Sequence, residues 1–384
     1  MKEGYLCLNC WRASSRQDAF FRCESCDTAA RPDWMQRRAG ALRRVRDVRR
    51  PFWAALFADD RGGPCARHPK ASYQLFCECG YLLTERAAVR GGAPMGLGIA
   101  GPRSSGKTLL VITMMHELHR LEVAGHRLGL VGLDDTEARF HRLSADFFDH
   151  GDKPHATAPE EAVAASWDDT RELPPGNFCW TVALEGQRRV APLLLAVNDL
   201  GGETWGLRSD ERRERFDRYL GHLGSLVFLV DGTSMAADLG IEVRDAWDRQ
   251  PPAGDRGAST RQWFSRIEER LANRARKIDL AIVISKADSL WEHDEGRALR
   301  AGAEIGDEDR QDVLARLLEA SHRRSVVIDG RQRFRRVRLF AVSSLGFRPT
   351  RDDVDKRGRL KRPVDPAGVT EPVAWLLRQR LGFR

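Results

Sequence analysis

The chain has 384 residues, of which 63 are Lys or Arg, 55 are Asp or Glu and 42% are hydrophobic. This composition is typical of a globular protein with two domains or one large one, and it excludes a collagen or a mainly disordered chain. The longest apolar run, residues 52–58, is far shorter than the roughly 20 residues that span a bilayer, and residues 1–18 lack the apolar core of a signal peptide. We therefore expect a cytoplasmic protein without a membrane partner.

The positive charge and the cysteines are concentrated at the start of the chain. The formal net charge is +8, but residues 1–90 hold 17 basic and 10 acidic residues, which leaves 46 basic against 45 acidic residues for 91–384. Seven of the eight cysteines precede residue 80. In a reducing cytoplasm such spacing indicates metal rather than disulfides. We predict a zinc-binding module over residues 1–90, a linker at 91–96 and a second domain over 97–384.

Two zinc sites are predicted in the first module. One joins two CxxC pairs at a spacing that lets four thiolates surround one ion, and its ligands are Cys7, Cys10, Cys23 and Cys26. The other, a weaker pattern, consists of Cys65, His68, Cys77 and Cys79. The alternatives are unrelated surface thiols and, for His68, an ordinary surface histidine. Because protein ligands would fill all four positions in each site, the predicted role of both ions is structural.

An arginine-rich segment lies between the two cysteine clusters. Residues 37–50 carry seven arginines, with Leu42, Val45 and Val48 at three-residue spacing, which predicts a basic amphipathic helix. Its surface could contact nucleic acid or an acidic protein, or could be a solvated face over the zinc modules. Zinc-bound thiolates would lower the net charge of residues 1–90 from +7 to about +4. Nucleic acid is therefore a possible partner but not the favoured one.

A phosphate-binding motif opens the second domain. A short strand is expected at residues 97–100 and a helix at 109–123, and the segment between them, Gly101-Pro-Arg-Ser-Ser-Gly-Lys-Thr108, matches GxxxxGK[ST]. The phosphates would lie against the loop formed by Gly101, Arg103, Ser104, Ser105 and Gly106. Lys107 would bridge the β- and γ-phosphates, and the Thr108 hydroxyl would ligate Mg²⁺.

A predicted hairpin supplies the acidic residue for the magnesium side of the site. Its strands are expected at residues 180–185 and 192–197, and the second one leads into Asp199. An Asp that follows an apolar strand in this way is placed to ligate Mg²⁺ beside the phosphates. Gly202 completes a DxxG spacing, in which its amide can reach the γ-phosphate.

Two later strands end in segments that fit a guanine base. Residues 279–284 lead into Ser285-Lys-Ala-Asp288, in which the Asp288 carboxylate can accept the N1 and exocyclic amino protons of guanine while the Lys286 stem covers the ring. Adenine offers no such pair of donors, although an ordinary strand end is the alternative interpretation. Residues 337–342 lead into Ser343 and Ser344, whose loop amides would reach the guanine oxygen.

The remaining pattern defines the predicted fold class. A further buried parallel strand is expected at residues 226–230, which lead into Asp231. Helices are expected at residues 138–148, 211–220 and 262–276, with polar breaks at 250–260 and 348–366. Alternating strands and helices predict a three-layer α/β fold with a mixed sheet and one antiparallel hairpin strand, preceded by the small zinc-binding modules. An exposed insertion is expected near residues 240–275.

The order of these motifs over about residues 95–384 resembles the translation-factor/Ras class of P-loop GTPases, for which the hairpin before DxxG is specific. The segment Asp199-Leu-Gly-Gly-Glu203, the Ser285–Asp288 motif, a late helix at Glu371 and the N-terminal zinc ribbon resemble the bacterial double-GTPase family of conflict and signalling gene clusters. The resemblance implies a GTP-hydrolysing switch that binds GTP or GDP with Mg²⁺. It also implies an effector or a second GTPase as partner.

Three positions depart from the pattern of that class. Glu203 replaces a water-positioning Gln, and because a carboxylate is repelled by the γ-phosphate, we expect slow turnover without a partner. Ser285 replaces the usual Asn or Thr, and the switch I threonine is not assigned among Thr157, Thr170 and Asn177. Two other functions stay open, a nucleotide-sensing adaptor with little turnover and a P-loop ATPase that acts on nucleic acid.

Overall fold

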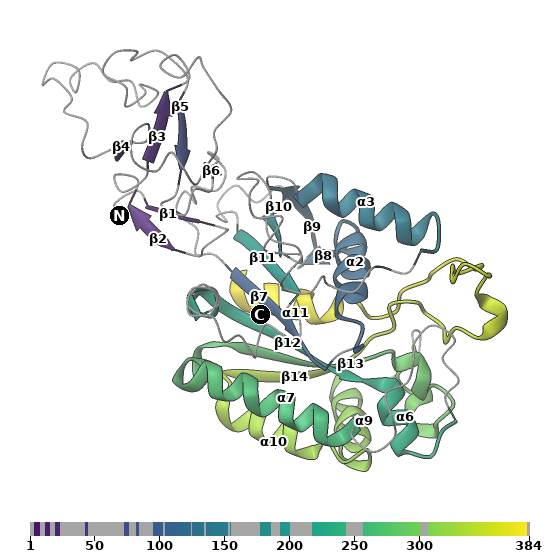
Figure 1. The fold of residues 1–384 in the computed structure, drawn as a ribbon. Coiled ribbons are helices and arrows are strands. Elements are labelled where there is room, and N and C mark those ends of the chain that lie inside the picture. The colour runs from purple at the N-terminus through teal and green to yellow at the C-terminus, as the bar shows by residue number, and fades with distance from the viewer. Residues whose placement is uncertain are drawn as a thin grey trace, which may run out of the picture.

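The main body of the protein is an eight-stranded mixed sheet with helices on both faces (Figure 1). This arrangement confirms the predicted α/β class. The computed structural model describes residues 4–7, 12–15, 20–23, 43–44, 73–76, 82–83, 95–102, 104–123, 125–133, 136–152, 154, 177–185, 193–199, 217–242, 256–300 and 306–381.

The sheet has the strand order β14-β13-β12-β7-β11-β10-β9-β8. The strands are β7 (Met95–Ala100), β8 (Glu122–Val123), β9 (His126–Gly132), β10 (Asn177–Leu184), β11 (Leu193–Asp199), β12 (Leu223–Asp231), β13 (Asp279–Ser285) and β14 (Arg336–Ala341). Five of them, β11, β7, β12, β13 and β14, are mutually parallel. Strand β10 is antiparallel to β11, as the hairpin prediction required.

The prediction of one antiparallel hairpin strand was incomplete. Strand β9 is also antiparallel to β10, and β8 is antiparallel to β9, so a second hairpin extends the sheet beyond β10. Gly125, with φ of 76°, lies in the turn between β8 and β9, where a left-handed backbone favours glycine. The helix expected at residues 109–123 ends earlier than predicted. Helix α2 spans Lys107–Leu118, and the last two residues of the predicted helix form β8.

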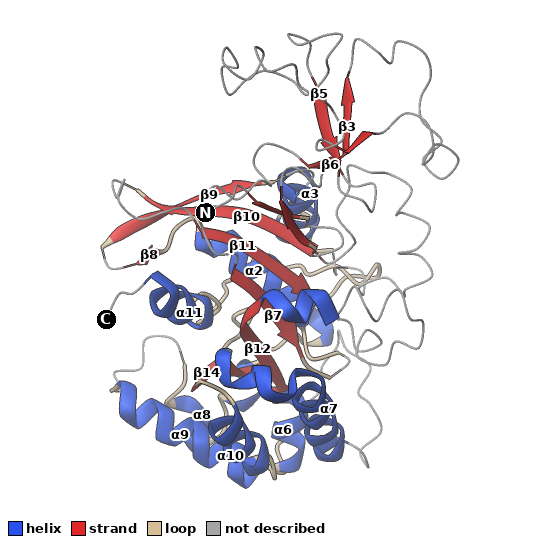
Figure 2. Ribbon diagram, turned by 90° about the vertical axis from the view of Figure 1, so that its left-hand side faces the viewer, coloured by secondary structure: helices blue, strands red, loops and turns tan. Residues whose placement is uncertain are grey.

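The helices form a layer on each face of the sheet (Figure 2). One face carries α6 (Gly232–Asp238), α7 (Arg256–Leu271), α9 (Asp307–Ala320) and α10 (Arg324–Arg333). The other carries α2, α3 (Thr136–Phe148) and α11 (Glu371–Leu381). Shorter elements are α8 (Asp294–Arg297), η4 (Ala272–Lys277), η5 (Ala287–Leu290) and η6 (Arg351–Asp353), and residues 217–222 are also helical.

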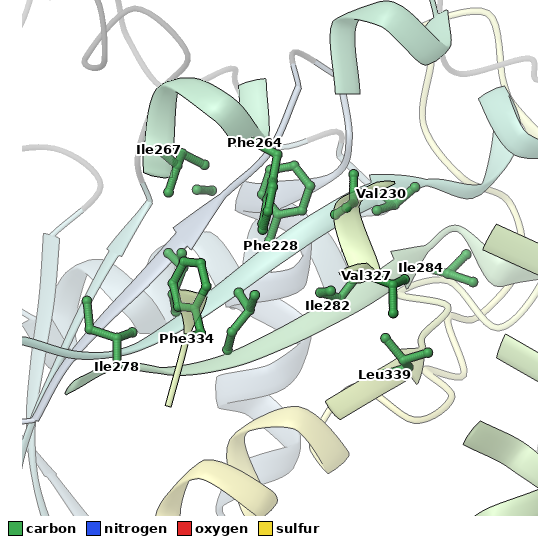
Figure 3. Packing of buried hydrophobic residues seen from close by; sticks show 14 of the residues in the cluster. Phe228, Val230, Phe264, Ile267, Ile278, Ile282, Ile284, Val327, Phe334 and Leu339 are labelled. Carbon is green, nitrogen blue, oxygen red and sulfur yellow. The ribbon is translucent and has the colours of Figure 1, made fainter. Parts of the chain in front are cut away.

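Side chains of the central strands alternate between two apolar cores. In β12, Phe228 and Val230 belong to the cluster shared with α7, α9 and α10, whereas Leu229 belongs to the one shared with α2 and α11. Figure 3 shows the first cluster, in which the Phe228 and Phe264 ring centroids are 5.0 Å apart. Strands buried on both faces are continuous apolar runs, which is why the sequence predicted β12 and β13 well.

The exposed insertion predicted near residues 240–275 is wrong for its second half. Helix α7 begins at Arg256, and its residues Phe264, Ile267 and Leu271 are buried against the sheet. The apolar spacing of these three residues accounts for the packing of this helix, despite the polar stretch before it. Residues 243–255 lie outside the described part of the chain. The predicted linker is also shorter than expected, because Met95 and Gly96 already belong to β7.

The polar break expected at residues 348–366 is an ordered loop that packs on the domain. Leu345, Phe347 and Leu360 form a small apolar cluster with Ile112 of α2 and Phe147 of α3. The Leu360 N–H also donates to the Gly151 carbonyl at 3.0 Å. Through these contacts the loop packs the segment after β14 against the end of α3.

The first residues of the chain form two small antiparallel sheets. Strands β1 (Gly4–Leu6) and β2 (Ala13–Ser15) pair as a hairpin, and a four-stranded sheet has the order β4-β3-β5-β6. Its strands are β3 (Phe20–Cys23), β4 (Arg43–Arg44), β5 (Tyr73–Phe76) and β6 (Leu82–Leu83). The basic helix predicted over residues 37–50 is wrong at Arg43 and Arg44, whose backbones pair with β3. The other residues of that prediction lie outside the described ranges.

A side chain closes one edge of the main sheet. The Gln311 amide of α9 donates to the Leu339 carbonyl of β14 at 2.8 Å, and the Leu339 N–H donates to the Gln311 Oε1 at 3.0 Å. The opposite edge is β8, which has two residues. An edge strand with occupied backbone groups and a very short edge strand both discourage pairing with other chains.

Candidate functional site: the carboxyl edge of the sheet

The loop between β7 and α2 has the geometry of an anion-binding turn. Ser104 and Gly106 have positive φ angles of 62° and 80°, and Gly106 is the N-cap residue of α2. The Leu110 N–H donates to the Gly106 carbonyl at 2.8 Å, which begins the helix directly behind the loop. Backbone amides and the positive end of the helix dipole at such a turn favour a bound phosphate.

Lys107 is folded back onto the loop. Its Nζ donates to the carbonyl oxygens of Gly101 at 3.2 Å and Pro102 at 2.8 Å, and the residue is buried. The two acceptors in these contacts are neutral carbonyl oxygens. A phosphate at the loop would offer the ammonium group a charged acceptor of the kind that forms stronger hydrogen bonds.

Two further residues fit a phosphate at this loop. A Cβ at Gly101 would lie 2.8 Å from the Leu229 carbonyl oxygen, so only glycine lets the loop pass this close to β12. The Ser105 Oγ is buried and has no hydrogen-bond partner among the described residues. Unsatisfied buried hydroxyls are uncommon in folded proteins, and a ligand in the loop would supply an acceptor.

The sheet brings the predicted magnesium residues near the loop. Asp199 is the last residue of β11 and pairs in register with Ile99 of β7, so its backbone lies one strand away from the start of the phosphate loop. Thr108 lies in the first turn of α2. Arg103, Gly202 and Glu203 lie outside the described residues.

The predicted base-binding segments contact each other. The Ser343 hydroxyl donates to the Asp288 Oδ1 at 2.5 Å, and the Gly346 N–H donates to the Ser343 Oγ at 2.9 Å. The Ala287 N–H donates to the Val342 carbonyl at 3.0 Å, which joins the two loops through their backbones as well. These contacts fix the Asp288 carboxylate at the edge of the sheet. Ser344 follows in the same turn and is half-buried.

The structure adds Asp231, for which the sequence suggested no role beyond ending a buried strand. Its Oδ1 lies 3.3 Å from the Lys286 Nζ, and its Oδ2 accepts the Ser234 N–H at 3.2 Å, which caps α6. Lys286 itself has a left-handed backbone with φ of 49°. A Cβ at Gly232 would overlap the Ser285 carbonyl oxygen, so the Asp231-Gly232 pair permits the close approach of the two loops. An acidic residue at the end of an apolar strand was the available signal.

Ser285 keeps a structural hydrogen bond although it replaces the usual Asn or Thr. Its Oγ donates to the Val230 carbonyl at 3.2 Å, and the residue is buried. This bond ties the start of the predicted base-binding segment to Val230 of β12, the residue that precedes Asp231.

The predicted zinc ligands are described only in part. Cys7 is buried, and its N–H donates to the Arg12 carbonyl at 3.1 Å across the hairpin of β1 and β2. Cys23 is the last residue of β3. Cys10, Cys26, Cys65, His68, Cys77 and Cys79 lie outside the described residues. Within the part of the chain that the structure describes, no group of three or more His, Cys, Asp or Glu side chains could hold a metal ion.

Comparison with known proteins does not assign a function to this site. None of the helices in the described ranges is both long and apolar enough to cross a membrane. The sequence matches no protein-family model, and a search of curated proteins finds no significant match.

Proposed function

We propose that the protein binds GTP at the carboxyl edge of the main sheet and hydrolyses it to GDP and phosphate, as a molecular switch. The observation that carries the proposal is the hydrogen bond between Ser343 and Asp288. It joins two segments 55 residues apart that the sequence had independently assigned to the base. Both follow strands parallel to β7, so they share an edge with the phosphate loop.

The side chains at this edge have distinct roles in the proposal. Lys107 would exchange the Gly101 and Pro102 carbonyls for phosphate oxygens, while Thr108 and Asp199 would hold Mg²⁺, which neutralises the charge on the phosphates. The Asp288 carboxylate would accept the two guanine protons. The ammonium of Lys286 is held by Asp231, which would keep the aliphatic stem of Lys286 over the base.

The strand directions in the sheet also support the proposal that the protein is a P-loop GTPase. Strand β10 is antiparallel to β11 and directly precedes it in the sequence, as in the hairpin expected of the translation-factor/Ras class of P-loop GTPases. The proposed switch would act on an effector or a second GTPase, as the likeness to the bacterial double-GTPase family implies. Glu203 in place of the water-positioning Gln favours slow hydrolysis that a partner accelerates.

Nucleotide choice tests the proposal directly. Calorimetric titration of the whole protein with Mg²⁺ should show GTP and GDP binding at least about 100-fold more tightly than ATP, because a carboxylate facing the base rejects adenine, which lacks both donors. Lys107→Ala should abolish binding of all three nucleotides, which serves as a control for binding outside the loop. Equal affinity for ATP and GTP would refute the guanine assignment.

We also propose that the first module binds two zinc ions at separate sites. In the pairing of β3 with β5, Cys23 lies opposite Tyr73, whereas Phe76, the residue before Cys77, lies opposite Phe20. The three residue steps between these positions correspond to about 10 Å, too far for one shared ion. Metal analysis of purified protein should therefore give two zinc ions per chain, and a value of one or less would contradict the two-site proposal.

A further inference from the structure

A group of exposed basic side chains lies at the amino edge of the main sheet, opposite to the candidate nucleotide site. Strands β12, β13 and β14 begin there in register, with Asp279 opposite both Ser225 and Arg336. Three segments contribute to this group, which we name the basic edge. Its members are Arg274, Arg276, Lys277, Arg335, Arg336, Arg378 and Arg380, all of them exposed.

Contacts between the segments show that these residues are neighbours. The Arg274 Nη2 of η4 donates to the Gly221 carbonyl at 3.1 Å. The guanidinium of Arg380, from α11, lies against Gly224, where a Cβ would overlap it. Arg336 of β14 hydrogen-bonds to Gln379 of α11. Gly221, just before β12, and Gly224, within it, thus let arginines from different helices lie directly on the backbone.

The basic edge has a large positive net charge, although the net charge of the domain as a whole is close to zero. Residues 272–279, 334–336 and 376–381 contain seven basic residues and a single acidic one, Asp279, which is a net charge of +6. Since residues 91–384 carry only +1 in total, the rest of the domain carries −5. Such a separation of charge gives one edge a strong positive potential that the composition concealed.

Most of this positive charge is not neutralised locally. Asp279 is fully buried and pairs with Arg335. Arg276, Lys277, Arg378 and Arg380 have no ion-pair partner among the residues that the structure describes. Burial and the neighbouring charge of Arg335 lower the pKa of Arg380, and the opposing effect of Asp279 does not offset them, so compensation of this cation is incomplete. An anionic ligand would supply it.

We propose that the basic edge binds the phosphodiester backbone of a nucleic acid. Six of its seven cations are arginines, whose planar forks match phosphate oxygens. A protein partner would be expected to meet an apolar centre, but the exposed large hydrophobic residues of the described ranges, Val131 and Ile328, lie in β9 and α10, outside the edge. Contacts to phosphates alone carry no base information, so binding is expected for any sequence.

The location leaves the nucleotide site accessible. The seven residues of β13 span roughly 20 Å between the two edges, so a nucleic acid and a nucleotide could be bound together. The inference rests on charge and packing at the amino edge and does not depend on the proposed GTPase activity.

Fluorescence anisotropy with the full chain and labelled oligonucleotides tests the proposal. The probes are a duplex DNA of about 20 base pairs with arbitrary sequence and an RNA duplex of the same length, titrated between about 50 and 200 mM salt. The wild type should bind at least one probe, with a steep salt dependence. Both Arg378→Gln/Arg380→Gln and Arg274→Gln/Arg276→Gln/Lys277→Gln should weaken binding at least about tenfold at low salt and reduce the slope of log K against log salt by about 2 or more.

A matched control removes the same charge elsewhere. Arg297→Gln/Arg324→Gln changes two exposed arginines on helices α8 and α10, near the carboxyl edge, and should leave binding within about twofold of the wild type, because screened charges roughly 20 Å away contribute little. Melting temperatures of all variants identify any that fail to fold, and the two basic-edge variants act through different segments.

The titrations either support or overturn nucleic-acid binding at the basic edge. Tighter binding of the DNA or of the RNA probe supports the proposal and identifies the source of the phosphates. Absence of binding by the wild type overturns it. Unchanged binding by both basic-edge variants also overturns it and places the contact elsewhere, such as in residues 1–90. Polyglutamate that displaces the oligonucleotide more effectively than unlabelled nucleic acid of equal charge would replace the nucleic acid by an acidic protein partner.

Discussion

Asp288→Asn is expected to invert the base preference of the nucleotide site from guanine to xanthine. A carboxylate accepts both the N1 and the exocyclic amino protons of guanine, whereas an amide offers one acceptor and one donor. Xanthine has a carbonyl oxygen in place of that amino group, so it pairs with the amide. The Ser343 hydroxyl, 2.5 Å from the Asp288 Oδ1, would still donate to the amide oxygen and turn the NH₂ group toward the base.

The variant should bind GTP about 100-fold more weakly than the wild type, since one charge-assisted bond is lost and two donors face each other. Xanthosine triphosphate should gain affinity and exceed GTP in a competition titration. Asp231→Asn is the matched control, because it removes the same charge at the same edge but contacts Lys286 rather than the base. It should lower the affinity for both nucleotides without changing their order. GTP binding by Asp288→Asn at the wild-type affinity would exclude Asp288 from the base site.

Replacing Arg335 by Met is expected to lower the free energy of unfolding by about 3 kcal/mol. The Arg335 Nε donates to the Asp279 Oδ1 at 2.7 Å, and its second nitrogen bonds to the other carboxylate oxygen. This hydrogen bond raises the pKa of Arg335. Asp279 has no exposed surface, so loss of its partner would leave a buried charge without compensation. Chemical denaturation at neutral pH measures the change.

Two controls separate the effect of losing the Arg335–Asp279 ion pair from the effect of losing any arginine at this edge. Arg336→Gln alters the next residue, which is exposed and contacts Gln379, and it should change the stability by less than about 0.5 kcal/mol. The double variant Arg335→Met/Asp279→Leu removes both charges together, and it should recover most of the lost stability. A single variant as stable as the wild type would show that another cation, such as Arg380, already compensates Asp279.

Long apolar strands were the part of the fold that sequence patterns predicted best. Strands β12 and β13 each contain a run of buried apolar residues, and each ends in a polar residue, Asp231 or Ser285, at the sheet edge. Helix α9 was missed, although Asp307, Glu308 and Asp309 in its first turn and the buried Leu314, Leu317 and Leu318 were available signals. Strands β8 and β9 were missed for a different reason, because β9 mixes exposed and half-buried positions without a clear period.

The residues of the proposed nucleotide site could be selected from the sequence because their motifs are local in sequence. The phosphate loop and the Ser285–Asp288 segment each place several interacting groups within eight residues, so spacing alone reveals them. Asp231 and Lys286 interact across 55 residues, and only the parallel pairing of β12 with β13 brings them together. The basic edge depends on the same kind of pairing, since its arginines come from three separate segments.

The error at residues 37–50 has a physical cause. Three-residue spacing of apolar residues favours a helix, but the backbones of Arg43 and Arg44 pair with Phe21 and Phe20 of β3. Tertiary pairing overrides local propensity in short segments, because two residues contribute little intrinsic preference. In the same sheet, Cys23 is the last residue of β3, and Phe76 of β5 pairs with Phe20, the first residue of β3. The spacing of the cysteines along the sequence does not predict this separation.

The occupied backbone groups of Leu339 and the short length of β8 disfavour strand addition at these two outer strands of the main sheet. A peptide that joined β14 by strand addition would have to displace both Gln311 hydrogen bonds, and one that joined β8 would find only two residues to pair with. A protein that associates at these strands is therefore expected to meet side-chain surfaces rather than to continue the hydrogen-bonded ladder. Association of that kind can be reversed without breaking backbone hydrogen bonds between chains, whereas a shared ladder would have to be broken strand by strand.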